Sequence, residues 1–209
     1  SNWTVNGPSH ISSLFSSIEK VRICPELNLN TSLSTQLAED LQDWVKLLLA
    51  GEIRRAGELS ERIHARGFCM YLTRDLDTAK KYVRDRYAES KDKRYGLIAS
   101  SKAKHLPKHG VLNDFQSTRR VKKGPWYNDD PTSKRSCCQL EEVVTEFACQ
   151  GLELDLPIVR WGGDLAWIGD EWVSPAQPRS KAQDPHNLRI NSYRVLLTRG
   201  RDGFIIFVP

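Results

Sequence analysis

Two segments in the second half of the chain combine residue types that suit chemistry on a phosphate group. The first, residues 145–155, reads TEFACQGLELD, and the second, residues 191–203, reads NSYRVLLTRGRDG. The first predicts a strand that enters a turn at Gly151, and ligands of α/β sheets gather where strands end. The second predicts arginines at the end of a helix, where a guanidinium suits either the helix dipole or an anionic ligand. Taken alone, each segment also has a purely structural explanation, as a turn glycine and as partners of the dipole.

Together, and in this order, the two segments resemble motifs V and VI of superfamily 1 helicases. Residues 145–153 are similar to a pattern of Thr, variable positions, a polar residue and Gly-Leu-Glu, and residues 193–199 look like a pattern of Tyr, hydrophobic residues and Thr-Arg. The resemblance is closest to the helicase-like ATPase family that includes the C-terminal part of Schlafen-group proteins. It covers most of residues 27–209.

The resemblance implies a role for each matched residue. Arg199 is expected to be the arginine finger that reaches the γ-phosphate of ATP held by a first RecA-like domain. The residues expected to bind ATP are Gly151, Glu153, Arg194 and Arg199. Thr145 and Glu146 are expected to face the nucleic acid. ATP and Mg²⁺ would be cofactors of the full-length protein, with neither bound by this chain alone.

Upstream, residues 71–75 and 95–102 look like the first two strands of the family's second RecA-like domain. The chain departs from the family pattern elsewhere, since it contains no Gly-x-x-x-x-Gly-Lys-Ser/Thr phosphate loop. The resemblance leads us to expect an arginine in the segment that holds Ser34 and a lysine at the position of Gln150. We therefore predict the second motor domain of an ATP-dependent DNA or RNA helicase or translocase, with an N-terminal RecA-like domain of the same parent chain as its partner. By itself this part of the ATPase is expected to be inactive.

Two other functions remain open. Ser34 and Gln150 are compatible with a non-catalytic module that binds nucleic acid or protein on a degenerate RecA-like scaffold. A stand-alone hydrolase that uses Asp164 or Glu153 is the third hypothesis, although the sequence offers no arrangement of nucleophile and base around them.

Other polar and aromatic residues are candidates for binding nucleic acid. Those that follow a predicted strand are Ser100, Ser101 and Lys102. A basic group next to Trp126 and Tyr127 consists of Arg119, Arg120, Lys122 and Lys123. Charge beside aromatic surface is typical of single-strand binders, and a solvated loop is the alternative. For Trp161, Trp167 and Trp172 we favour packing at the sheet edge, and for the histidines and cysteines of residues 105–138 we favour a loop without zinc.

The elements that must position these residues follow from hydrophobic periodicity. The predicted strands cover residues 68–73, 95–99, 141–147, 156–161 and 203–208. Helices are predicted at residues 8–20, 34–50, 52–66 and 188–198, and a further helix is predicted to begin after its cap, Asp75. Strand, helix and strand in succession, with continuous apolar runs, predict a parallel sheet. We expect a three-layer α/β RecA-like domain at residues 68–209, with a basic loop insertion at residues 102–139, preceded by a helical segment at residues 1–67.

Composition sets the outer limits. The 209 residues are 39% hydrophobic and 27% charged, which suits a globular chain with a core. No apolar run reaches the roughly 20 residues that a membrane span needs, and no signal-peptide pattern begins the chain, so we expect a cytoplasmic protein without a membrane partner. Five cysteines in no regular spacing argue against a disulfide scaffold, and the net charge of +5 decides nothing about partners.

Overall fold

The computed structural model describes residues 32–175 and 184–209. Residues 36–209 form a compact unit of their own, and the description below concerns that unit. The helix predicted at residues 8–20 lies outside the described residues. The predicted boundary at residue 67 stays a prediction.

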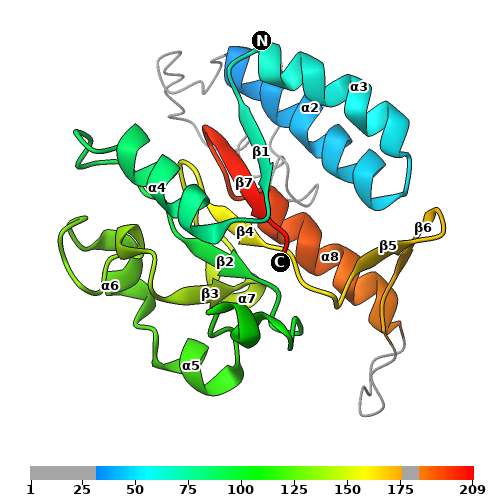
Figure 1. Cartoon of the computed structure of the whole chain (residues 1–209). Helices are drawn as coiled ribbons and strands as arrows, with labels where there is room; N and C mark the ends of the chain where they lie inside the picture. Colours follow the sequence, from blue (N-terminus) through cyan, green and yellow to red (C-terminus); the bar gives the residue numbers. More distant parts are fainter. Residues whose placement is uncertain (1–31, 176–183) are drawn as a thin grey trace, which may run out of the picture. The chain divides into compact units, whose positions relative to one another are not determined.

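A five-stranded parallel sheet forms the centre of this unit and confirms the predicted α/β class (Figure 1). The strand order is β1 (Cys69–Thr73), β7 (Gly203–Phe207), β4 (Ile158–Arg160), β2 (Leu97–Ala99) and β3 (Val143–Thr145). The register places Ile206 between Leu72 and Val159, and Ile98 between Val144 and Val159. The three inner strands are almost wholly buried, which explains their continuous apolar sequences.

Helix α2 (Ser32–Leu49) packs on the sheet through Trp44, and α3 (Ile53–Ala65) packs against β1 and is followed by Phe68. The rings of Trp44 and Phe68 lie 5.5 and 5.8 Å from the ring of Phe204 on β7. The turn between the helices contains Gly51 at a φ of +82°, a left-handed conformation that glycine adopts without strain. The predicted helix pair is therefore confirmed.

Helix α4 (Leu76–Arg86) follows β1 and packs against β1 and β7. The predicted cap is confirmed, because the Asp75 carboxylate accepts hydrogen bonds from the backbone N–H groups of Asp77 and Thr78. Helix α8 (Pro185–Leu197) precedes β7 and buries Ile190, Leu196 and Leu197. The sequence predicted this helix with a start three positions later.

The insertion at residues 102–139 is more structured than the predicted loop. It contains η2 (Leu106–His109), α5 (Phe115–Arg120), α6 (Lys123–Asn128) and η3 (Cys137–Gln139). Helices of six residues or fewer are too short to display a 3.6-residue period, so periodicity did not reveal them. Trp126 is fully buried in the core, which corrects its prediction as a surface for stacking bases.

Two further elements differ from the predictions. The strand predicted at residues 141–147 ends at Thr145, and α7 (Glu146–Cys149) begins directly after it. Residues 166–173, which lie outside the predicted strands and helices, form an antiparallel hairpin of β5 (Ala166–Ile168) and β6 (Glu171–Val173). The hairpin is fixed to the α2–α3 turn, since the Trp172 indole N–H donates to the Leu48 carbonyl at 2.7 Å. None of the described helices is long and apolar enough to cross a membrane.

Candidate functional site

The two segments that the sequence singled out meet at the amino-terminal edge of the sheet. Residues 152–155 lie just before β4 and residues 199–202 just before β7, and β4 and β7 are neighbours. The Leu154 N–H donates to the Arg199 carbonyl and the Arg201 N–H donates to the Leu154 carbonyl, both at 2.8 Å. We call the group Gly151, Leu152, Glu153, Arg199 and Arg201 the arginine site.

This location partly corrects the expectation that the first segment lies where strands end. Thr145 and Glu146 do lie at the carboxyl end of β3. Because α7 then carries the chain away from that end, Glu153 reaches the opposite edge of the sheet, next to Arg199. One segment therefore contributes to both edges.

The Arg199 guanidinium is held by groups of its own domain. It donates from Nε to the Val195 carbonyl at 2.9 Å, from Nη1 to the Leu152 carbonyl at 3.2 Å, and from Nη2 to Thr198 Oγ1 at 3.1 Å. The side chain is half-buried. Arg194 lies on α8 and is exposed, with its guanidinium donating to the Asn191 side-chain oxygen.

Arg201 is the arginine of the site that is most open to solvent. Its Nε and Nη2 donate to Glu153 Oε2 at 2.7 and 2.6 Å, and both side chains are 59% exposed. The hydrogen bond to Glu153 raises the pKa of Arg201. The sequence grouped Arg201 with the arginines that could meet phosphates but did not assign it to the ATP site, although it stands two positions after the Thr-Arg pair.

A layer of ion pairs behind the arginine site fixes the loops before β4 and β7. Lys93 Nζ lies 2.9 Å from Asp155 Oδ1 and 2.8 Å from Asp202 Oδ2, and these carboxylates raise the pKa of Lys93. The Arg94 N–H donates to Asp155 Oδ2 at 2.7 Å, and the Tyr127 hydroxyl donates to the Glu153 carbonyl at 2.7 Å. No sequence pattern predicted this layer, because its members come from four separate segments.

At the carboxyl-terminal edge, residues expected to face nucleic acid lie together but mostly inside the protein. Glu146 accepts from the Ser101 N–H at 2.8 Å and from the Ser101 hydroxyl at 2.9 Å. Ser100, Thr145 and Glu146 are all buried. Lys102 follows them and is exposed. Only the outer members of this group are therefore accessible to a ligand on the surface.

These residues belong to a larger buried polar cluster, which sequence reasoning missed. Its members are Ser100, Glu146, Asp164, Arg189, Ser192 and Tyr193. The Arg189 guanidinium lies 3.1 Å from Ser100 Oγ, 3.8 Å from Glu146 Oε1 and 3.6 Å from Asp164 Oδ2. Two buried carboxylates thus share one guanidinium. The only sequence pattern that could have indicated it is the four-residue spacing of Arg189 and Tyr193 on one helix face.

Asp164 is held from two sides. It accepts hydrogen bonds from the Ser100 hydroxyl at 2.5 Å and from the Tyr193 hydroxyl at 2.7 Å. Burial raises the pKa of Tyr193 well above its ordinary value, so this hydroxyl stays protonated and remains a donor. The arrangement satisfies Asp164 internally and gives it no free oxygen for the hydrolase chemistry considered above.

The predicted basic group is exposed on and around α5. Arg119 and Arg120 end this helix, and Lys122 and Lys123 follow it. Helix α5 packs against β3, the strand that ends at Thr145. The Arg119 guanidinium lies 5.9 Å from the centre of the exposed Phe115 ring. The group is thus a solvent-accessible source of positive charge beside the sheet.

Within residues 32–175 and 184–209, no three His, Cys, Asp or Glu side chains are close enough together to hold a metal ion. His105 and His109 lie near each other, with ring centres 6.1 Å apart. Cys137 and Cys138 are buried, with sulfur atoms 4.0 Å apart.

Comparison with known proteins adds a family. The family model described as Schlafen group 3, DNA/RNA helicase domain, matches residues 4–209. No curated protein matches the chain, and no solved structure matches it either.

Proposed function

The chain belongs to the Schlafen group 3 DNA/RNA helicase domain family, and from this membership we propose that it is the second motor domain of an ATP-dependent helicase or translocase. In this proposal the unit has the three-layer arrangement of a RecA-like domain. The five-stranded parallel sheet supports it, as do the contacts of α2 with Phe204 and of α4 with β1 and β7.

The single observation that carries the proposal is the arginine site. Two segments 40 or more positions apart in sequence, which resemble motifs V and VI, bond to each other through Leu154, Arg199 and Arg201. These backbone bonds continue the parallel pairing of β4 with β7 and place the two segments side by side.

The residues of the arginine site suit a nucleoside triphosphate. Guanidinium groups bind phosphate oxygens through paired N–H donors, and Arg201 is exposed for this purpose. The Glu153 carboxylate, equally exposed, can accept a hydrogen bond from a ribose hydroxyl. Gly151 has a φ of +83°, and an added Cβ there would meet no atom within 4 Å, so the backbone is open to a ligand.

In the mechanism, Arg199 stabilises charge. ATP with Mg²⁺ would be held by the phosphate loop of an N-terminal RecA-like domain in the parent protein and would supply the phosphoanhydride bond. Phosphoryl transfer to water depends on positioning and charge stabilisation, and an arginine finger contributes ~10³ to 10⁵ in rate in related systems. Arg199 would exchange its contact with the Leu152 carbonyl for a contact with the γ-phosphate. Glu153 would bind a ribose hydroxyl, and Arg201 would bind other phosphate oxygens of the nucleotide.

Nucleic acid would bind at the carboxyl-terminal edge. Lys102 and the basic group at residues 119–123 provide accessible positive charge for the phosphate backbone. Glu146 and Ser100 would act indirectly, because they are buried and shape the loop that presents Lys102.

The test is to replace Arg199 in the parent protein with Ala and with Lys. We expect ATP turnover to fall by about 10³-fold or more in Arg199→Ala, with little recovery in Arg199→Lys, because an ammonium lacks the planar fork of donors. Steady-state phosphate release measures turnover, and thermal unfolding checks that the loss of the Leu152 contact leaves the fold intact. Arg55→Ala is the matched control, since Arg55 is exposed and pairs with Glu52, the residue at the N-cap of its own helix.

Unchanged hydrolysis in Arg199→Ala would remove the finger assignment. If the parent protein neither binds nor hydrolyses ATP but binds single-stranded nucleic acid, this would instead support a non-catalytic nucleic-acid-binding module.

A further inference from the structure

A pocket of about 790 Å³ opens beside the carboxyl-terminal edge of the sheet, and none of the residues assigned above to ATP or nucleic acid lines it. One wall is the face of α3 that carries Ala56, Gly57 and Ser60, and the opposite wall consists of Trp161, Trp167 and Trp172. Its floor is formed by side chains of β1 and β7, among them Met70, Leu72, Phe204 and Ile206. We call this the tryptophan pocket.

The pocket leaves unusual apolar surface open to solvent. Leu72 is 72% exposed and Trp167 is 37% exposed. The small residues of α3 keep the opening wide, because a Cβ added at Gly57 would meet no atom within 4 Å. Contiguous exposed apolar surface of this kind marks an interaction site more often than a defect in packing. Its volume lies within the range of ligand pockets.

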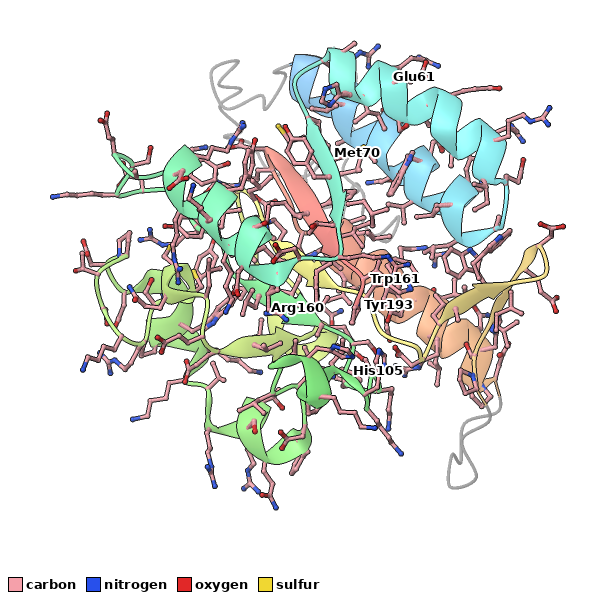
Figure 2. The ribbon with its side chains drawn as sticks, viewed as in Figure 1. Glu61, Met70, His105, Arg160, Trp161 and Tyr193 are labelled. Carbon is pink, nitrogen blue, oxygen red and sulfur yellow. The ribbon has the colours of Figure 1, made fainter. Side chains whose placement is uncertain are left out.

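The tryptophans form a connected aromatic wall. The rings of Trp161 and Trp172, and those of Trp172 and Trp167, have centres 5.2 Å apart. The ring centres of Trp161 and Tyr193 lie 4.2 Å apart, and Figure 2 labels this pair. The wall is held rigidly, since the Trp161 indole N–H donates to the Leu165 carbonyl and that of Trp172 to the Leu48 carbonyl, both at 2.7 Å. A rigid aromatic surface favours flat ligands that stack.

The charge at the pocket selects among such ligands. Arg74 is the charged side chain of the lining, and His105 adds a second nitrogen-bearing group. Exposed Lys102 and Lys104 stand on the same loop as His105. A ligand with a flat aromatic part can stack on the tryptophans, and a negative charge on the same ligand can pair with Arg74 and the nearby lysines. A nucleotide unit has both parts.

We propose that the tryptophan pocket binds unstacked bases of a single-stranded nucleic acid, with Arg74 contacting the phosphate of the bound nucleotide. The proposal rests on the proposed function, and it locates one part of the nucleic-acid face. It also revises our preference for pure packing at Trp167, whose indole is partly exposed. Trp161 is buried and keeps its packing contacts, and the half-buried Trp172 supports the Trp167 ring.

The test measures binding of the 209-residue chain to two fluorescein-labelled 15-mers, an oligothymidine and an abasic strand with the same phosphates. We expect Trp167→Ala to weaken oligothymidine binding about tenfold and to leave abasic binding unchanged, because it removes stacking and no charge. Arg74→Ala should weaken both. Ile168→Ala is the matched control, since Ile168 is exposed on the same strand and does not line the pocket.

A second variant covers the case in which Trp167→Ala unfolds the hairpin. Gly57→Leu fills the pocket from an open helical position and removes no contact, so it should weaken oligothymidine binding with the fold intact. The pocket proposal would be overturned if neither variant altered oligothymidine binding, or if the affinity for the abasic strand fell equally. Either result would leave the proposed function standing. No binding of either strand by the unaltered chain would overturn the nucleic-acid face itself. If the chain binds an apolar peptide in the pocket and this peptide does not compete with either strand, the pocket belongs to a protein partner. This result would also overturn the proposal.

Discussion

At the scale of single residues, Arg160 is the most unusual side chain of the core. It occupies the last position of β4 and is fully buried, and its Nε, Nη1 and Nη2 have no hydrogen-bond partner. Figure 2 shows it between the sheet and α4. Its guanidinium lies 5.2 Å from the centre of the Phe207 ring. Burial lowers the pKa of Arg160 to about 9, and the charge of Asp77 opposes this shift only in part.

We expect Arg160→Met to stabilise the protein. The substitution removes a buried charge without a partner and keeps most of the side-chain volume, so the free energy of unfolding at pH 7 should rise by about 1–3 kcal/mol. Urea unfolding of both proteins measures the difference. A loss of stability would mean that the Phe207 contact outweighs the cost of burying the charge.

The same variant gives a pH test with a defined sign. The folded pKa of Arg160, about 9, is below its unfolded value, so the unfolded state binds more protons than the folded state from about pH 9 up to the unfolded pKa. The burial penalty is complete below pH 9 and fades as the pH rises through this window. The stability gap between Arg160→Met and the unaltered chain should therefore narrow above pH 9, and a constant gap up to pH 11 would contradict the assignment.

At the scale of elements, aspartate side chains cap the first turns of α4 and α5. Asp75 caps α4, and Asp114 caps the six-residue α5 through the N–H groups of Gln116 and Ser117. Short helices gain little from internal cooperativity, so the cap and the packed face decide whether they form. The Arg119–Arg120 charge would be presented differently without the α5 cap.

Asp75→Ala should loosen α4 and lower the melting temperature at neutral pH. Hydrogen bonds from Thr78 lower the pKa of Asp75 from its ordinary value of 3.8, so its contribution is complete above that value and disappears as the pH falls through the lowered pKa. The melting temperatures of the variant and the unaltered chain should therefore converge in strong acid. Asp85→Ala, near the other end of α4, is the control and should not lower the melting temperature. A difference that persists unchanged below pH 2 would argue against capping.

At the scale of the whole unit, the buried polar cluster joins elements that are distant in sequence. Arg189 on α8 contacts Ser100 after β2, Glu146 after β3 and Asp164 after β4. Tyr193, on the same helix, packs on Trp161 of the tryptophan pocket. Since α8 also ends next to Arg199, one helix connects the proposed base pocket, the buried cluster and the arginine site.

Arg189→Met should destabilise the unit by about 3–5 kcal/mol, because it leaves Glu146 and Asp164 buried without their shared cation. Urea unfolding at pH 7 measures this loss. The matched control is Arg194→Met, an exposed arginine on the same helix, for which we expect a change within about 0.5 kcal/mol. Equal effects of the two substitutions would show that the cluster does not hold α8 to the sheet.

The sequence by itself determined the fold class and the pairing of two motifs. Continuous apolar runs such as residues 203–208 indicate buried parallel strands, and Asp75 marked a helix start, because both are local properties of the chain. The pairing of the Gly-Leu-Glu motif with the Thr-Arg motif was inferred from a family resemblance and not from geometry.

Only the tertiary structure decided which groups meet in the core. Since β7 lies between β1 and β4, it sets Arg160 against Phe207. Arg189 meets its two carboxylates, Glu146 and Asp164, on two other segments and the Ser100 hydroxyl on a third. Local patterns carry no record of such long-range neighbours, because the sheet order that creates them results from packing the whole chain.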